Sequence, residues 1–153
     1  SAGFKAHKAG AAVAEGRLGG VKLVLAKPTT FMNVSGRPVA ALLKFYSLDA
    51  SHLIVLHDEL DIAPGEIKLK QGGGNGGHNG LKDITKHFAG PNYYRVRVGV
   101  GRPPAPQDPA DFVLKPFSSA EKKFLNDFIA RSALAVERLI EKGLETAQQE
   151  FNK

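Results

Sequence analysis

The sequence contains no cysteine, no long apolar run and no methionine at its start. The absence of cysteine excludes disulfide bonds, thiol catalysis and cysteine-ligated metals, and it fits a reducing cytoplasm, where we expect the protein to act. No apolar run approaches the ~20 residues that span a bilayer, so we expect no membrane association. The first residues also lack the apolar core of a signal peptide, and the missing initiator methionine suggests a trimmed chain.

Acidic residues are fewer than basic ones, 15 against 21, which gives a formal net charge of +6. This excess favours a polyanionic partner, and nucleic acid is the leading class, although many basic proteins are merely soluble. The 153 residues, 42% of them hydrophobic, suffice for one domain with a real core. We therefore expect a single domain, residues 1–153, acting as a monomer.

The most unusual segment is a glycine-rich loop, QGGGNGGHNG, at residues 71–80. Glycine tolerates positive φ angles and lets another molecule approach the backbone closely. A helix is expected to begin near Leu81, and its first N–H groups would suit a phosphate or a developing oxyanion. His78 and Asn79 stand at this junction, one a possible acid, base or donor and the other an amide donor. The simpler interpretation is a flexible surface loop.

Hydrophobic periodicity predicts strands and helices in alternation. Strands are expected at residues 10–18 and 21–26, around a Gly19-Gly20 turn, and at 52–57, 66–70 and 94–100. The continuous apolar run at 52–57 is typical of a strand covered on both faces. Helices are expected after an N-cap at Ser35, near Leu81, from the capping box 118–121 to a stop at Gly143, and from Glu145. The expected fold is α/β, with a central twisted mixed sheet flanked by helices.

Basic side chains gather on the two alternating strands beside the glycine-rich loop. Lys68 and Lys70 share one face of the first strand, and Arg95 and Arg97 are expected to point outward from the other, opposite Val96 and Val98. For any one of these side chains, solubilising surface charge is about as good an explanation as phosphate binding. As a set, the four favour phosphate binding.

Two other patterns carry less weight. Residues 72–77 satisfy the dinucleotide-binding pattern G-x-G-x-x-G, but a glycine-packed segment does so by chance, and no acid follows at the expected distance. The cluster Asp58, Glu59 and Asp61 offers carboxylates for magnesium, but a short acidic cluster at a strand end is more often simply solvated, so we expect no metal. His57 and Asp58 are adjacent on a strand, so their side chains should diverge, and Asp58 would orient a histidine from elsewhere. His7, His52 and His87 are expected to be plain surface residues.

Four segments, in this order, resemble the signatures of bacterial peptidyl-tRNA hydrolase: KPTTFMNVSG at 27–36, HDELD at 57–61, GGGNGGHNGL at 72–81 and RVRVGVGRP at 95–103. The resemblance covers almost the whole chain. It implies the fold of that family and hydrolysis of the ester between a peptide and the 3′ end of its tRNA, which recycles tRNA for translation, with no cofactor.

The resemblance also implies residue roles. Asn33 matches an active-site amide near the scissile ester, Asp58 matches the carboxylate that orients the catalytic imidazole, and Asn79, beside His78, would position water or stabilise the oxyanion. Phe31, Met32 and Gly76 would line the peptide channel. Lys70 and Arg97 look like the clamp on the tRNA 5′ phosphate, with Lys68 and Arg95 as neighbouring basic contacts. Asn33, Asp58 and Asn79 should converge on one pocket.

One departure from the family pattern bears on activity. The family begins with a strand carrying Gly-Leu-Gly-Asn-Pro-Gly and continues to a Thr-Arg-His-Asn segment whose histidine is the general base, and neither motif occurs in this sequence. We therefore expect the first strand, first helix and base to be missing, and this chain to be weakly active or inactive although the full-length parent is a hydrolase. A non-catalytic RNA-binding protein on the same fold is the main alternative, and a nucleotide-dependent oxidoreductase is a minor one.

Overall fold

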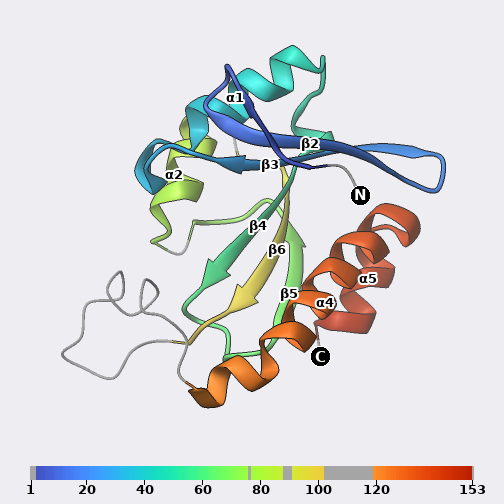
Figure 1. Ribbon diagram of the computed structural model, residues 1–153. Coiled ribbons are helices and arrows are strands. Elements are labelled where there is room, and N and C mark those ends of the chain that lie inside the picture. The colour runs from blue at the N-terminus through green and yellow to red at the C-terminus, as the bar shows by residue number, and fades with distance from the viewer. Residues whose placement is uncertain (1–2, 76, 88–90, 102–118, 153) are drawn as a thin grey trace. The chain divides into compact units, whose positions relative to one another are not determined.

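The computed structural model describes residues 3–75, 77–87, 91–101 and 119–152, with the backbone alone for 119–126 (Figure 1). These residues belong to two compact units: a first unit of residues 1–53 and 73–92, and a second unit of residues 54–72 and 93–153. The predicted α/β class, with a mixed sheet and flanking helices, is confirmed. The described strands form two three-stranded sheets, one in each unit, rather than one central sheet. The assignment of residues 1–153 to a single domain remains a prediction.

The sheet of the first unit is an antiparallel meander. It consists of β1 (Lys5–His7), β2 (Ala11–Leu18) and β3 (Val21–Pro28), in the order β1-β2-β3. Gly19 has a φ of +59°, a conformation that glycine adopts without strain, and this accounts for the tight hairpin between β2 and β3. The two strands predicted around Gly19-Gly20 are thus confirmed, and the second extends two residues further than expected.

Four helical segments complete the first unit: η1 (Met32–Val34), α1 (Gly36–Phe45), η2 (Ala50–His52) and α2 (Asn79–His87). Leu42 on α1 packs into a core with Ala11 and Val13 of β2, and α1 also contacts α2. Burial of this apolar stripe, rather than helix propensity alone, holds α1 on the sheet.

Ser35 stands at the N-cap position of α1, as predicted, but the capping hydrogen bond expected of it is absent. Its Oγ instead donates to the carbonyl oxygen of Met32 at 2.7 Å, and its backbone is helical, with φ −66° and ψ −22°. An N-cap that bonds its own helix adopts extended dihedrals. The continuous turn from η1 into α1 removes that option, so another side chain must serve the first N–H of α1.

The sheet of the second unit is mixed, as predicted. It contains β4 (Ile54–Glu59), β5 (Ile67–Gln71) and β6 (Tyr94–Gly99) in the order β4-β6-β5, with β4 parallel and β5 antiparallel to β6. Among the described strands β4 is therefore an edge, and Leu56 is 54% exposed. The expectation of a strand covered on both faces is wrong for β4, because a short apolar run does not by itself distinguish an edge strand from a central one.

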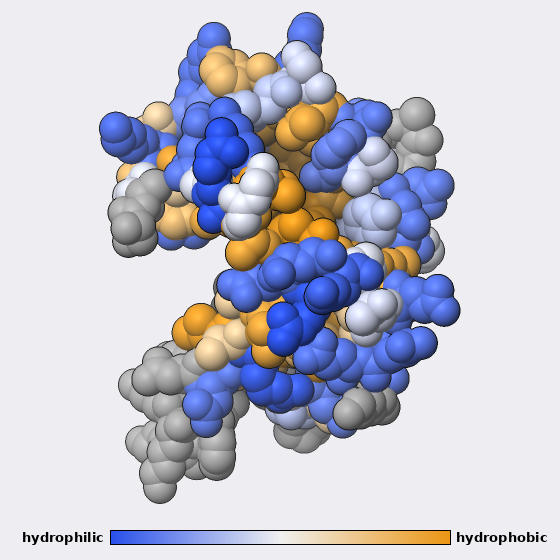
Figure 2. All heavy atoms as spheres, turned by 90° about the vertical axis from the view of Figure 1, so that its right-hand side faces the viewer, coloured by the Kyte–Doolittle hydropathy of each residue, from blue (hydrophilic) through white to orange (hydrophobic). Residues whose placement is uncertain are grey.

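Two helices pack on one face of this sheet, α4 (Ser119–Lys142) and α5 (Leu144–Phe151). They are separated by Gly143, whose φ of +85° ends α4 as predicted. The core consists of Ile67, Leu69, Val96, Ala135, Leu139 and Ala147. Figure 2, viewed from the side on which α4 and α5 lie in Figure 1, shows hydrophilic residues over much of the outward face of these helices.

Ile129 of α4 lies outside this core and is 57% exposed. A helix stripe is wider than the strip of sheet that α4 covers, so residues at its margin stay in solvent. The side chain of Leu125, the capping serine Ser118 and the proline-rich segment 102–109 lie outside the described residues.

The outer edge of β5 is closed by side chains of α5 and of the residue that follows it. Asn152 accepts the Leu69 N–H through Oδ1 at 2.7 Å and donates to the Leu69 carbonyl oxygen through Nδ2 at 2.8 Å. Gln148 donates to the same carbonyl oxygen at 3.1 Å. Leu69 is completely buried, so without these amides its backbone groups would lack partners away from water.

Replacing Asn152 by alanine should therefore destabilise the protein. We expect Asn152→Ala to lower the free energy of unfolding by about 1–3 kcal/mol, the cost of an unsatisfied buried backbone group. Urea denaturation measures the difference. Gln149→Ala, an exposed amide on α5, is the matched control and should change stability little. Equal urea midpoints for the two variants would refute the role of Asn152.

Candidate active site

The glycine-rich loop leads into α2 through a histidine cap. Gly72, Gly73 and Gly77 all have positive φ, between +72° and +94°, which explains why this turn requires glycine. His78 then accepts the Leu81 N–H through Nδ1 at 3.2 Å, the bond that an N-cap side chain makes to the third helical residue. His78 thus has a structural role that was not predicted. Gly76 lies outside the described residues.

A wide-open surface cavity of about 210 Å³ lies between η1 and α2. It is lined by Asn33, Asn79, Lys82, Asp83 and Lys86. The two amides that were expected to share a pocket, 46 residues apart in sequence, are thus brought to one cavity within the first unit. Both residues are exposed, so their amide groups are available to a ligand. Their catalytic roles remain predictions.

Three of the lining residues were not identified from the sequence: Lys82, Asp83 and Lys86. They follow Asn79 at positions +3, +4 and +7, the spacing that places side chains on one face of a helix. That spacing was the available signal, and it would have added these residues once Asn79 had been identified.

Apolar side chains are exposed beside this cavity. Phe31 is 85% exposed, Met32 57% and Val34 42%, an unusual concentration for three neighbouring positions. The Met32 sulfur lies so close to α2 that a Cβ added to Gly80 would be 2.7 Å from it. Gly80 therefore lets η1 approach the first turn of α2. Phe31 and Met32 are exposed apolar residues, and their role in a peptide channel remains a prediction.

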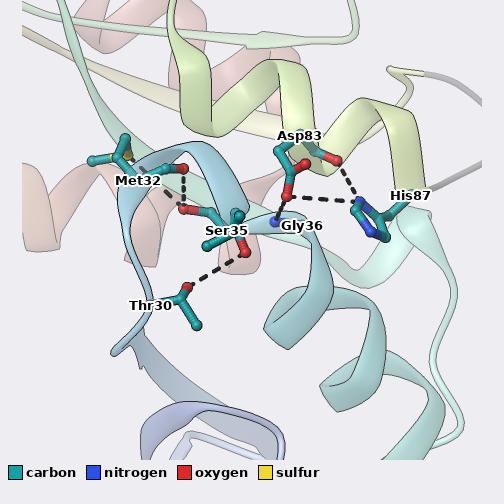
Figure 3. Close-up of polar contacts among 7 residues, drawn as sticks. Thr30, Met32, Ser35, Gly36, Asp83 and His87 are labelled. Atoms are coloured by element: carbon teal, nitrogen blue, oxygen red, sulfur yellow. Dashed lines mark hydrogen bonds and ion pairs between the residues drawn. The ribbon is translucent and has the colours of Figure 1, made fainter.

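The joint between α1 and α2 is made by Asp83 (Figure 3). Its Oδ2 accepts the Gly36 N–H, the first N–H of α1, at 2.6 Å. Asp83 thus caps α1, which Ser35 does not do. A carboxylate at the positive end of α1 is also favoured by the helix dipole. His87 lies against the same residue, with Nδ1 2.8 Å from the Asp83 carbonyl oxygen and 3.7 Å from Oδ2. His87 is exposed, as expected of a surface residue, but it is not isolated.

This joint determines where Asn33 lies. Asn33 belongs to η1, which runs directly into α1, whereas Asp83 and Asn79 both belong to α2. Fixing Gly36 on Asp83 therefore fixes the distance between the two amides. The approach is close: a Cβ on Gly36 would overlap the Asp83 carbonyl oxygen and lie 2.5 Å from His87 Nδ1.

In the second unit, the four predicted phosphate-binding residues face one another across two strands. Lys68 pairs with Arg97 and Lys70 with Arg95 in the register of β5 and β6. Like charges directly opposite in a sheet repel. Burial, reinforced by the charges of Arg97 and Arg95, lowers the pKa of Lys70, while Glu59 acts in the other direction. Burial also lowers the pKa of Arg97. A bound anion would relieve both effects.

Arg95 differs from the other three. Its side chain is completely buried, and its Cζ lies 4.6 Å from the centre of the Tyr93 ring, a cation–π contact. The prediction that Arg95 points into solvent is wrong, because the alternation of a strand gives the face of a side chain and not its exposure. Lys68, Lys70 and Arg97 are partly exposed.

Asp58 lies near the C-terminal end of β4 and is half-buried. His57 and Asp58 pair with Arg97 and Val98, so their side chains do take opposite faces, as expected. His57 is 8% exposed, with Nδ1 2.8 Å from the Asp58 carbonyl oxygen. Asp58 belongs to the second unit and the two amides to the first, and their convergence remains a prediction.

Within the described ranges, no three histidine or acidic side chains are grouped so that they would hold a metal ion. None of the helices in that part of the chain has the length and apolarity needed to cross a membrane.

Comparison with known proteins identifies the family. The profile described as "Peptidyl-tRNA hydrolase" matches residues 1–153. The peptidyl-tRNA hydrolase of Renibacterium salmoninarum is 60% identical over 154 residues, covering 99% of this chain and 79% of that protein. The one of Kineococcus radiotolerans is 55% identical over 156 residues, covering 97% and 79%. The crystal structure of peptidyl-tRNA hydrolase from Acinetobacter baumannii superimposes with a TM-score of 0.87 at 36% identity, covering 97% of this chain and 76% of that one.

Fold and relatives together define an ester-cleaving hydrolase of the α/β class. The chain belongs to the peptidyl-tRNA hydrolase family.

Adding a methyl group at Gly36 should open the joint between α1 and α2. We expect Gly36→Ala to lower the free energy of unfolding by about 1–3 kcal/mol, because a backbone carbonyl of α2 must move away. Gly16→Ala is the control, since a Cβ there meets nothing within 4 Å. Urea denaturation of both variants tests the joint, and a Gly36→Ala protein as stable as Gly16→Ala would contradict it.

Proposed function

We propose that this chain acts on peptidyl-tRNA and hydrolyses the ester that joins the peptide to the 3′ end of the tRNA, thereby recycling tRNA for translation. The supporting observation is the cavity that holds both Asn33 and Asn79, in a chain whose relatives at 55–60% identity are named peptidyl-tRNA hydrolase. The absence of cysteine fits the reducing cytoplasm in which such a reaction would occur.

The two amides would act on the ester carbonyl. Water attacks the carbonyl carbon, negative charge grows on the carbonyl oxygen, and N–H groups of Asn33 and Asn79 donate to that oxygen. The ester C–O bond then breaks, the peptide leaves as a carboxylic acid, and the ribose oxygen takes a proton. Donors that are already in place stabilise the charge without reorganising, and the α1–α2 joint would hold the two amides in place in this way.

Asp58 would act through an imidazole. A carboxylate that accepts the Nδ1–H of a histidine fixes its tautomer and stabilises the imidazolium formed when the ring takes a proton from water. Because His57 points to the opposite face of β4, the imidazole that Asp58 orients would come from another position.

The remaining predicted contacts are of two kinds: apolar residues for the peptide and basic residues for the tRNA. Phe31 and Met32 would hold the peptide, together with Gly76, and His78 would support this end of the site as the cap of α2. Lys70 and Arg97 would hold the 5′ phosphate of the tRNA, with Lys68 beside them. Arg95 is completely buried, so its positive charge would attract the phosphate without direct contact.

The second candidate function is RNA binding without catalysis, for which the basic side chains of β5 and β6 would suffice without the two amides.

Removal of either amide should slow the reaction. We expect Asn33→Ala and Asn79→Ala to reduce the single-turnover rate of ester cleavage about 10²–10³-fold, the usual cost of one oxyanion donor, while binding of peptidyl-tRNA changes little. Asp58→Asn should reduce the rate as well. Asn92→Ala, an exposed amide in the same unit, is the control. Binding without cleavage above the uncatalysed rate would establish the RNA-binding alternative, and equal rates for Asn79→Ala and Asn92→Ala would overturn the assigned role.

The 5′ phosphate should matter through Lys70 and Arg97. We expect kcat/KM to be roughly tenfold or more higher for a substrate with a 5′ phosphate than for one with a 5′ hydroxyl, the value of a charge-assisted contact. This preference should vanish in a Lys70→Gln/Arg97→Gln variant and persist in Lys44→Gln. It requires charged Lys70, so it is present below the pKa of Lys70 and lost as pH rises through it, at a lower pH than for an ordinary lysine. A preference that survives in the double variant would refute the clamp.

A further inference from the structure

We infer that Lys82 and Lys86 on α2 form a second phosphate-binding subsite, which holds the sugar-phosphate backbone at the single-stranded 3′ end of the RNA. This inference rests on the proposed function and extends it, because it assigns a binding task to the face of α2 that borders the two amides. Its residues are distinct from those of the basic strands in the second unit.

The geometry places both lysines at the cavity. They line it together with Asn33 and Asn79, and both side chains are exposed. Lys82 and Lys86 are one helical turn apart, so their Cβ atoms are about 5–6 Å from each other on the same face. Their ammonium groups can therefore reach a ligand whose end lies against the amides.

The charge of the cavity is unbalanced. Its one carboxylate, Asp83, is 14% exposed and is engaged by the Gly36 N–H, so it faces the α1–α2 joint (Figure 3). Within the part of the chain that the structure describes, Lys82 and Lys86 make neither an ion pair nor a hydrogen bond through their side chains. Two ammonium groups against one carboxylate leave the cavity with a net positive charge, which favours an anion.

Three of the other five lysines of the first unit have partners, whereas Lys5 and Lys44 make no ion pair or cation–π contact with the residues that the structure describes. Lys22 pairs with Glu15 at 3.2 Å, Lys8 lies over the Phe45 ring at 5.5 Å, and Lys27 lies over the Phe4 ring at 3.9 Å. The pair on α2 therefore differs from these three. Lys86 stands in the last turn of α2, where the helix dipole stabilises a cation. Lys82 lies nearer the start of the helix, where the dipole does not stabilise it. The dipole explains at most one of the two.

The substrate supplies the matching anion. If Asn33 and Asn79 hold the ester, the nucleotides that precede it must leave the cavity along a neighbouring surface. Each of them carries a phosphate, and this holds for every peptidyl-tRNA whatever its peptide. A lysine pair at the rim would anchor these phosphates irrespective of base sequence and so set the ester against the amides.

The test is a Lys82→Gln/Lys86→Gln variant of the whole chain, compared with Lys44→Gln. Lys44 is exposed and stands in the last turn of α1, so it matches Lys86 in charge and in helix position. We expect the double variant to bind peptidyl-tRNA roughly tenfold more weakly at low salt. The dependence of log Kd on log salt should become shallower by about 0.7 for each phosphate that the variant no longer neutralises. Urea denaturation checks that the variant remains folded.

Two further substrates distinguish binding at this subsite from binding of the 5′ phosphate and from ester cleavage. The weakening should persist with a 5′-hydroxyl peptidyl-tRNA and disappear with a peptidyl ester of adenosine, which has no phosphate. Disappearance of the effect on removal of the 5′ phosphate, or an effect equal to that of Lys44→Gln, would overturn the inference. If the chain binds tRNA with this lysine dependence yet cleaves no ester, the proposed hydrolysis fails and the subsite stands.

Discussion

The hydrogen bond from the Gly36 N–H to Asp83 is the contact on which the first unit's cavity depends. It closes the start of α1 with a side chain from α2, and it does so because the turn out of η1 leaves Ser35 in a helical conformation, unable to cap its own helix. Gly36 has no side chain, so the backbone of α1 can approach the Asp83 carbonyl oxygen and the His87 ring of α2 closely. Asn33 and Asn79 come from different helices, and this single tie makes them neighbours.

Much of the fold could be predicted from local pattern. Alternation identified β2, β3, β5 and β6, the glycine pair identified the hairpin, and Gly143 identified the end of α4. The errors share one cause. Pattern gives the face of a residue, but burial depends on what lies opposite, so the sequence predicted Arg95 in solvent and Leu56 in the interior, and both predictions were wrong. Likewise, the apolar run of β4 does not reveal that the described sheet continues on one side only.

Site residues that stand in a sequence motif could be predicted. Residues whose role depends on a contact with a distant part of the chain could not. Asn33 and Asn79 were predicted because they stand in recognisable segments, and the structure brings both to one cavity, while their roles remain predictions. Asp83 was missed because its value lies in a bond across 47 residues to a glycine N–H, which no spacing rule contains. His78 illustrates the same limit: its identity suggested acid–base chemistry, whereas its Nδ1 completes the first turn of a helix.

The amides that cover the edge of β5 have a consequence for biosynthesis. Asn152 follows Leu69 by 83 residues, so the strand that carries Lys68 and Lys70 emerges from the ribosome long before its outer edge can be satisfied. Until then that edge can pair with any extended neighbour, including a nascent copy of the same chain. We expect the interval between these two events to be the period in which this sheet is most dependent on chaperones.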